Sequence, residues 1–212
     1  VIKVMQESPK EYVCLMKHYS SQKESRLLEM FKKFTGPIYQ IPPFQAAVKR
    51  ELRIRRIYEI EMLEHSSKKT LFRVLCEGGT YIRNLCEDIG SALGAGGIME
   101  QLIRTKSGPF TIENSITMIE AHDMYKAWKD SGDQTKLSSI LKPLEDMLVD
   151  IPSIEVKDSA VDALCHGADL GVPGVAMVSK NMKRGQLISI KTARGEAIAL
   201  ARATMNADEI AE

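Results

Sequence analysis

The spacing of apolar residues changes at one glycine pair, Gly78-Gly79, and this change constrains the fold more than any other feature. Before the pair, residues 71–76 form a short apolar run typical of a buried strand. After it, apolar residues recur at helical spacing, at Ile82, Leu85, Cys86, Ile89 and Leu93. The sequence therefore predicts a strand, a tight turn and an amphipathic helix, with glycines that let the backbone approach a ligand.

Further patterns predict a mixture of strands and helices. Residues 12–16 form a β-branched and aromatic run, and apolar and charged residues alternate over 52–62. Ser21 and Glu24 have the capping-box spacing, which predicts a helix that ends before Gly36-Pro37. These elements predict an α+β fold with a mixed sheet and flanking helices.

The second half of the chain has a different character. Residues 137–148 have helical apolar spacing, and Pro143 predicts a kink or a late helix start there. Short strands and glycine-rich turns are predicted from about residue 153. We therefore place a domain boundary near 149–152, with domains over 1–150 and 151–212.

Composition excludes several classes of protein. With 212 residues, 44% of them apolar and 27% charged, the chain can bury a core, which excludes disordered, collagen-like and coiled-coil proteins. No apolar stretch is long enough for a transmembrane helix, so no membrane partner is expected. The four cysteines lack CxxC spacing and are predicted to be buried and reduced, as in a cytoplasmic protein. The four histidines share no ligand spacing, so no metal site is predicted.

Positive charge gathers in two stretches although the formal net charge is only +1. Residues 41–58 contain five cations and one anion, and the charged residues of 180–194 are all positive. Two basic stretches suit binding of a phosphate backbone. Protection of strand edges against aggregation is the alternative explanation.

Arg83 falls in the first turn of the predicted helix. A cation there is unfavourable unless an anion compensates it, so the position indicates a carboxylate or phosphate partner. The alternative is a surface arginine beside a packed Tyr81.

Several ordered motifs resemble the TruB/dyskerin family of pseudouridine synthases, in its archaeal and eukaryotic branch. In the first domain they are Gly79-Thr80-Tyr81-Ile82-Arg83-Asn84-Leu85 with 88–90, the segment 36–43 with 46–50, and Leu102 with Arg104. In the second, residues 157–163, 167–175 and 194–199 resemble a PUA domain, a small β-barrel.

The resemblance implies isomerisation of uridine to pseudouridine in RNA. The glycosidic bond breaks and the sugar rejoins the base at C5, so no cofactor is expected. The target uridine must leave the base stack.

By match to the family motifs, Tyr81 lines the uracil pocket and Arg83 pairs with the catalytic aspartate. Tyr12 contacts the base and is the candidate for proton transfer at C5, while Leu102 packs against the uracil. Lys49 is expected to hold the RNA backbone or the pocket wall with its neighbours Arg50, Arg53 and Arg55.

The resemblance also implies RNA contacts in the second domain. The loop from Gly167 to Gly174 is expected to bind the ACA end of a guide RNA, and Lys183 and Arg184 are expected to grip RNA. The expected partners are tRNA, or guide RNA with ribosomal RNA, and the small proteins of an H/ACA ribonucleoprotein.

No aspartate of the sequence has the setting of the family's nucleophile. We expect that residue upstream of Val1, and the closing strand of the PUA domain after Ala211, so that the chain is a segment truncated at both ends. The alternative is a non-catalytic RNA-binding or scaffold protein of the same fold.

Overall fold

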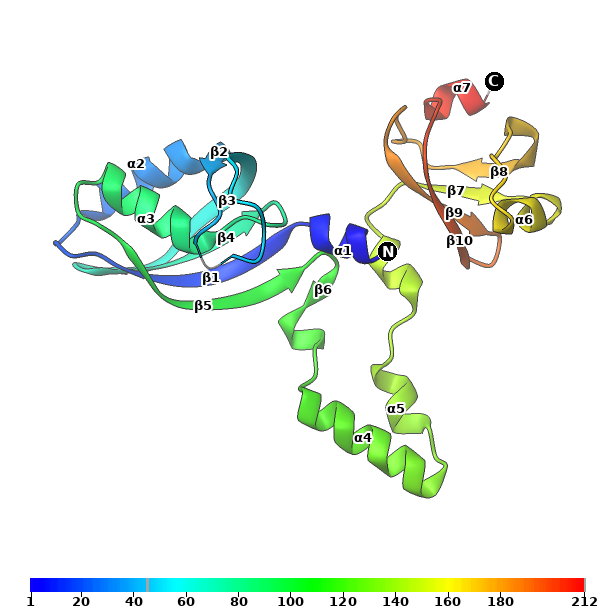
Figure 1. The fold of residues 1–212 in the computed structure, drawn as a ribbon, viewed down its shortest axis with the longest axis horizontal. Coiled ribbons are helices and arrows are strands. Elements are labelled where there is room, and N and C mark those ends of the chain that lie inside the picture. The colour runs from blue at the N-terminus through cyan, green and yellow to red at the C-terminus, as the bar shows by residue number, and fades with distance from the viewer. Residues whose placement is uncertain (45, 212) are drawn as a thin grey trace. The chain divides into compact units, whose positions relative to one another are not determined.

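The protein is described by a computed structural model over residues 1–44 and 46–211 (Figure 1). Its contacts divide it into two compact units, residues 2–115 and the residues from 116 onward. The sequence predicts a different division, into functional domains over 1–150 and 151–212, and that division stays a prediction.

The first unit is built on one antiparallel sheet with the strand order β2-β3-β4-β1-β5-β6. Helices α2 and α3 cover one face of this sheet (Figure 1). The strands are β1 (Lys10–Lys17), β2 (Gly36–Gln40), β3 (Arg53–Ser66), β4 (Lys69–Cys76), β5 (Ile98–Ser107) and β6 (Phe110–Thr111). The helices are α1 (Ile2–Glu7), α2 (Glu24–Phe34), α3 (Ile82–Ala92) and the 3-10 turn η1 (Ile112–Asn114).

The core of this unit forms between the two helices and the central strands. All five apolar residues of the predicted helix 82–93 are buried in it, which confirms that helix and its inward face. They pack with buried residues of the sheet and of α2, namely Cys14, Met16, Leu27, Phe31, Phe72 and Val74. The strand, turn and helix predicted around Gly78-Gly79 are therefore present as β4, a turn and α3.

The start of α2 differs from the prediction. The helix begins at Glu24, and Lys23 is its N-cap residue without a side-chain hydrogen bond, so the predicted capping box at Ser21 is wrong. A capping box forms at Thr117 and Glu120 instead, where it opens the unpredicted helix α4 (Met118–Ser131).

The second unit begins with helical segments and continues into a small sheet. Pro143 interrupts the predicted helix as expected, because α5 (Thr135–Ile140) ends before it and the 3-10 turn η2 (Leu144–Leu148) follows it. The sheet has the order β10-β9-β7-β8, with β7 and β9 parallel. Its elements are β7 (Ser153–Val156), α6 (Asp158–Cys165), η3 (Val172–Gly174), β8 (Val175–Val178), β9 (Leu187–Thr192), β10 (Ala197–Arg202) and α7 (Ala207–Ala211).

The cysteines are free, and three of them, Cys14, Cys76 and Cys86, are buried as predicted. Cys165 is exposed, so its predicted burial is wrong. It ends α6, and the preceding residue Leu164 is the one that this helix buries in the core. None of the helices in the described ranges has the length and apolar character needed to span a membrane.

Candidate functional site

A pocket of about 390 Å³ lies where the turn after β4 meets β1 and β5. Four residues predicted from the sequence line it together, Tyr12 from β1, Tyr81 and Arg83 from the start of α3, and Leu102 from β5. Pro43, Ala46, Thr80, Ile82 and Met99 complete its wall. Residues distant in sequence therefore meet at one cavity.

The position of Tyr12 follows from the pairing of β1 in the middle of the sheet. Tyr12 is the register partner of Val74 on β4 and of Arg104 on β5. The Arg104 guanidinium lies 5.9 Å from the centre of the Tyr12 ring, within the range of a cation–π contact. Burial raises the pKa of the Tyr12 hydroxyl, and the charge of Arg104 opposes that rise.

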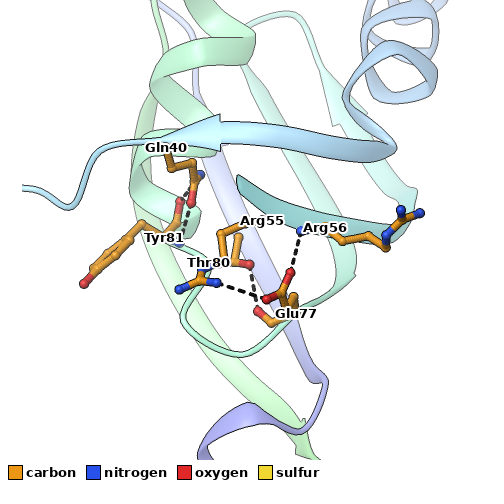
Figure 2. Close-up of polar contacts among 6 residues, drawn as sticks. All are labelled: Gln40, Arg55, Arg56, Glu77, Thr80 and Tyr81. Carbon is orange, nitrogen blue, oxygen red and sulfur yellow. Dashed lines mark hydrogen bonds and ion pairs between the residues drawn. The ribbon is translucent and has the colours of Figure 1, made fainter. Parts of the chain in front are cut away.

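Glu77 anchors the turn between β4 and α3 to strand β3 (Figure 2). Its carboxylate accepts a hydrogen bond of 3.0 Å from the Arg55 guanidinium and another of 3.0 Å from the Arg56 backbone N–H. Its carbonyl oxygen accepts the Thr80 hydroxyl at 2.7 Å. Hydrogen bonds of Glu77, before the glycine pair, and of Thr80, after it, therefore hold the turn in place.

The backbone conformation of Gly79 favours glycine at this turn, because its φ is +82°. A Cβ there would be in ordinary contact with the Arg55 side chain, at 3.4 Å from a terminal nitrogen. The Arg55 side chain is 21% exposed and is paired with Glu77, so it supports the turn. The RNA contact that the sequence predicts for Arg55 stays a prediction.

Arg83 is exposed in the first turn of α3. Over residues 1–44 and 46–211, no acidic side chain forms an ion pair with it. No aspartate or glutamate is among the described residues that line the pocket. An anion that enters the pocket would therefore find this guanidinium available.

The predicted cations of 49–53 contact other residues of the loop that carries Pro43 and Ala46. Lys49 forms an ion pair with Glu51, and the Arg53 guanidinium donates to the Lys49 carbonyl oxygen at 3.1 Å. Arg50 lies 5.7 Å from the centre of the Phe44 ring. Lys49 does not line the pocket itself.

The predicted RNA contacts of the second unit occupy two segments. Gly167, with a φ of +86°, follows α6 and has open space where a side chain would stand. Gly174 is in close contact, since a Cβ there would lie 3.1 Å from Ala160 and Leu170. Lys183 and Arg184 are exposed in the connection between β8 and β9.

Gln40 is a residue of this region that the sequence reasoning missed. Its buried amide binds the backbone of Tyr81 across 41 positions of sequence. Gln40 lies within the motif segment 36–43, but no local pattern indicates its role, because the signal is a tertiary contact between the end of β2 and the start of α3.

Family models match almost the whole chain. The N-terminal domain model of the TruB family of pseudouridylate synthases matches residues 2–82, and the model of the tRNA pseudouridylate synthase B C-terminal domain matches residues 83–149. The PUA domain model matches residues 152–212.

Curated and solved proteins give the same result. The chain is 50% identical over 202 residues to a protein of Methanocaldococcus jannaschii named "Probable tRNA pseudouridine synthase B", covering 95% of this chain and 60% of that protein. A protein of Archaeoglobus fulgidus with the same name is 47% identical over 210 residues, covering 99% of this chain and 65% of that protein.

This chain resembles a protein in the crystal structure of a Cbf5-Nop10-Gar1 complex, with 42% sequence identity and a TM-score of 0.92. The match covers all of this chain and 64% of the chain in that complex. A second structure, of an H/ACA RNP bound to a substrate RNA containing 2'-deoxyuridine, matches at 40% identity with a TM-score of 0.90. The chain spans 60% of the length of the Methanocaldococcus jannaschii protein and 65% of that of the Archaeoglobus fulgidus protein. With an α+β fold, a lined pocket and consecutive matches to both TruB models and the PUA model, the chain belongs to the TruB family of pseudouridylate synthases.

Proposed function

We propose that this chain forms the base pocket and the RNA-binding PUA domain of an enzyme that isomerises uridine to pseudouridine in RNA. The observation that carries the proposal is the convergence of Tyr12, Tyr81, Arg83 and Leu102 on one pocket of about 390 Å³. A cavity of this size, with apolar walls and few polar groups, suits a small planar ligand such as a flipped base.

The reaction needs no redox or group-transfer partner. The bond from C1′ to N1 of the base breaks, a bond from C1′ to C5 forms, C5 loses its proton and N1 gains one. Substrate and product are isomers, so the proposal includes no cofactor. The uridine has to leave its stack to reach the pocket, and the ring of Tyr81 offers a surface that replaces the lost stacking.

The proposed roles follow the chemistry of each side chain. Arg83 would hold a carboxylate against the sugar, because its guanidinium has no acidic partner over the described ranges. Tyr12 is the candidate for proton transfer at C5, because its side chain lines the same pocket as Tyr81 and Arg83. Leu102 would pack against the base. The nucleophilic aspartate would come from outside these 212 residues.

The substrate and partners are proposed from the relatives. Curated relatives are named as tRNA pseudouridine synthases, and solved relatives occur in complexes with Nop10 and Gar1 or with a substrate RNA. We infer tRNA, or ribosomal RNA selected by a guide RNA, as the substrate, with small H/ACA proteins as partners. The loop 167–174 and the exposed Lys183 and Arg184 would contact RNA. A cytoplasmic location is part of the proposal, supported by the free cysteines.

A second candidate is an RNA-binding scaffold without catalysis. It is favoured by one observation, that the described residues lining the pocket include no carboxylate. Loss of the C5 proton separates the two functions, because only the isomerisation releases it.

The test uses the complete protein that contains this segment, with its partner proteins and guide RNA in one series and without them in another. Transfer RNA and ribosomal RNA substrates carry tritium at C5 of uridine. Release of tritium into water with formation of pseudouridine supports the enzyme. Binding of the same RNAs with no release in either series would contradict it and support the scaffold.

A further inference from the structure

Gln40, the last residue of β2, binds both backbone polar groups of Tyr81 (Figure 2). The Tyr81 N–H donates to Oε1 of Gln40 at 2.9 Å, and Nε2 of Gln40 donates to the Tyr81 carbonyl oxygen at 3.0 Å. The Gln40 residue is only 3% exposed. Because both ends of one planar amide are engaged, the contact fixes the orientation of the Tyr81 backbone as well as its distance.

Tyr81 depends on this contact more than an interior helical residue would. It is the N-cap residue of α3, with φ −95° and ψ 104°, and no side chain caps the helix there. Its carbonyl oxygen accepts the first helical hydrogen bond, from the Leu85 N–H at 3.1 Å, but its own N–H lies outside the helix. The side-chain amide of Gln40 accepts the hydrogen bond from the Tyr81 N–H, for which the helix offers no acceptor.

The same contact joins two segments that line the pocket. Gln40 directly precedes the loop that carries Pro43, and both Pro43 and Tyr81 line the pocket. A second bond reinforces the junction, since the Asn84 side chain donates to the Ile41 carbonyl oxygen at 2.8 Å. Gln40 does not line the pocket, and the hydrogen bonds of its side chain over the described residues both go to Tyr81, which does.

We propose that Gln40 is a positioning residue, which holds the Tyr81 ring in the orientation that receives the flipped uracil. The inference rests on the proposed function, because it assigns Gln40 a role in the same reaction. A displaced ring would leave RNA binding on the outer surfaces unchanged and would misplace the base for chemistry.

The test measures tritium release in single turnover at saturating RNA, together with the Kd for that RNA, in the complete protein. Gln40→Met keeps the length of the side chain and removes both hydrogen bonds. We expect the rate to fall by at least about tenfold, as misplacement of a reacting group predicts, with the Kd within about twofold of its original value. The matched control is Gln6→Met, because Gln6 is exposed and its side chain forms no hydrogen bond over the described ranges. An unchanged rate, or equal losses in rate and affinity, would overturn the proposal.

Gln40→Glu gives a second, pH-dependent readout. A protonated carboxyl can accept from the Tyr81 N–H and donate to its carbonyl oxygen, whereas the carboxylate can only accept. Relative to the unaltered enzyme, this variant should gain rate as the pH falls. A rate ratio that does not change with pH would count against the two-bond contact, even if Gln40→Met failed to fold.

A double-mutant cycle with Tyr81→Ala separates this proposal from the proposed function. If Gln40 acts through the ring, Gln40→Met should change the rate by less than about twofold once the ring is absent. Additive losses would overturn the positioning role alone. If Tyr81→Ala itself left the rate unchanged, the proposed function of the pocket would fail instead.

Discussion

Tyr12 and Arg104 are direct partners across β1 and β5, with the guanidinium 5.9 Å from the centre of the ring. Burial raises the pKa of the hydroxyl and Arg104 lowers it, so the two effects oppose each other at one atom of the pocket.

Removing the Arg104 charge should therefore leave burial and the nearby Cys76, which both raise the pKa of Tyr12. Arg104→Ala is expected to raise the pKa of Tyr12 further, whereas Arg104→Lys, which keeps a cation, should change it less. The measurement is an NMR titration of ring-labelled tyrosines, with Tyr12 assigned by its loss in Tyr12→Phe. A lower pKa in Arg104→Ala would contradict the proposed coupling.

Glu77 should stabilise the turn before α3 through its contacts with Arg55 and Arg56. Glu77→Ala is expected to cost about 2 kcal/mol, because a charged hydrogen bond in a partly buried setting is lost and Arg55 is left unpaired. Glu77→Gln should cost less, since its amide oxygen still accepts from the Arg56 N–H. Hydrogen exchange of β4 amides measures the change.

A pair with more exposed side chains serves as the control for this prediction. Glu61 forms an ion pair with Arg73, and both side chains are 45% exposed. Glu61→Ala should cost less than about 1 kcal/mol, as surface pairs usually do. Equal costs at Glu61 and Glu77 would argue against a special role for the turn.

The first unit should lose stability in mild acid because of His18. This residue is fully buried, and its Nε2 lies 2.9 Å from Oγ1 of Thr70, which also contacts His65. Burial lowers the pKa of His18, the nearby His65 adds to this, and a backbone contact with Gly96 opposes it. The folded state therefore favours neutral His18, and protonation favours the unfolded state.

The sign of the pH dependence follows from that preference. The stabilising contribution is fully present above the unfolded pKa of about 6.5 and is lost as the pH falls below it, by at most about 1.4 kcal/mol per pH unit for one proton. Hydrogen exchange of β1 amides across this range should show the loss. His18→Gln should flatten the profile, and the exposed His122→Gln should not. A profile that keeps its slope in His18→Gln would exclude His18 as the cause.

Lys183 and Arg184 should contribute to RNA affinity through phosphate contacts. The double variant Lys183→Ala with Arg184→Ala should reduce the slope of log K against log salt by up to about two, measured between about 50 and 200 mM salt. Single-turnover chemistry at saturating RNA should stay the same, because both residues lie outside the pocket. An unchanged slope would remove this segment from the RNA interface.

Local sequence patterns were sufficient where one element carries its own signal. The change of period at Gly78-Gly79 predicted β4, the turn and α3, because a strand buries alternate residues and α3 buries one face. The motif match likewise placed Tyr12, Tyr81, Arg83 and Leu102 in a common site, and the pocket contains all four.

Other elements gave no such signal. Strand β5 is mostly exposed and lacks apolar alternation, so its pairing with β1 and β6 defines it. Helix α4 buries no residue, so its sequence signals are its ends, the capping box at Thr117 and the C-cap Gly132. The capping-box spacing at Ser21 was misleading because α2 begins three residues later, at Glu24. The contact of Gln40 with Tyr81 joins distant segments and has no local pattern.

The measurement that decides whether this pocket performs chemistry is the effect of Arg83→Ala on the complete protein, with Arg83→Lys as the matched variant. Single-turnover tritium release and RNA affinity are measured on the same samples. If Arg83 holds a carboxylate at the sugar, the rate should fall by about 100-fold while the Kd changes by less than about twofold, and lysine should restore only part of the rate. Equal losses in rate and affinity, or an unchanged rate, would contradict a catalytic pocket at this site.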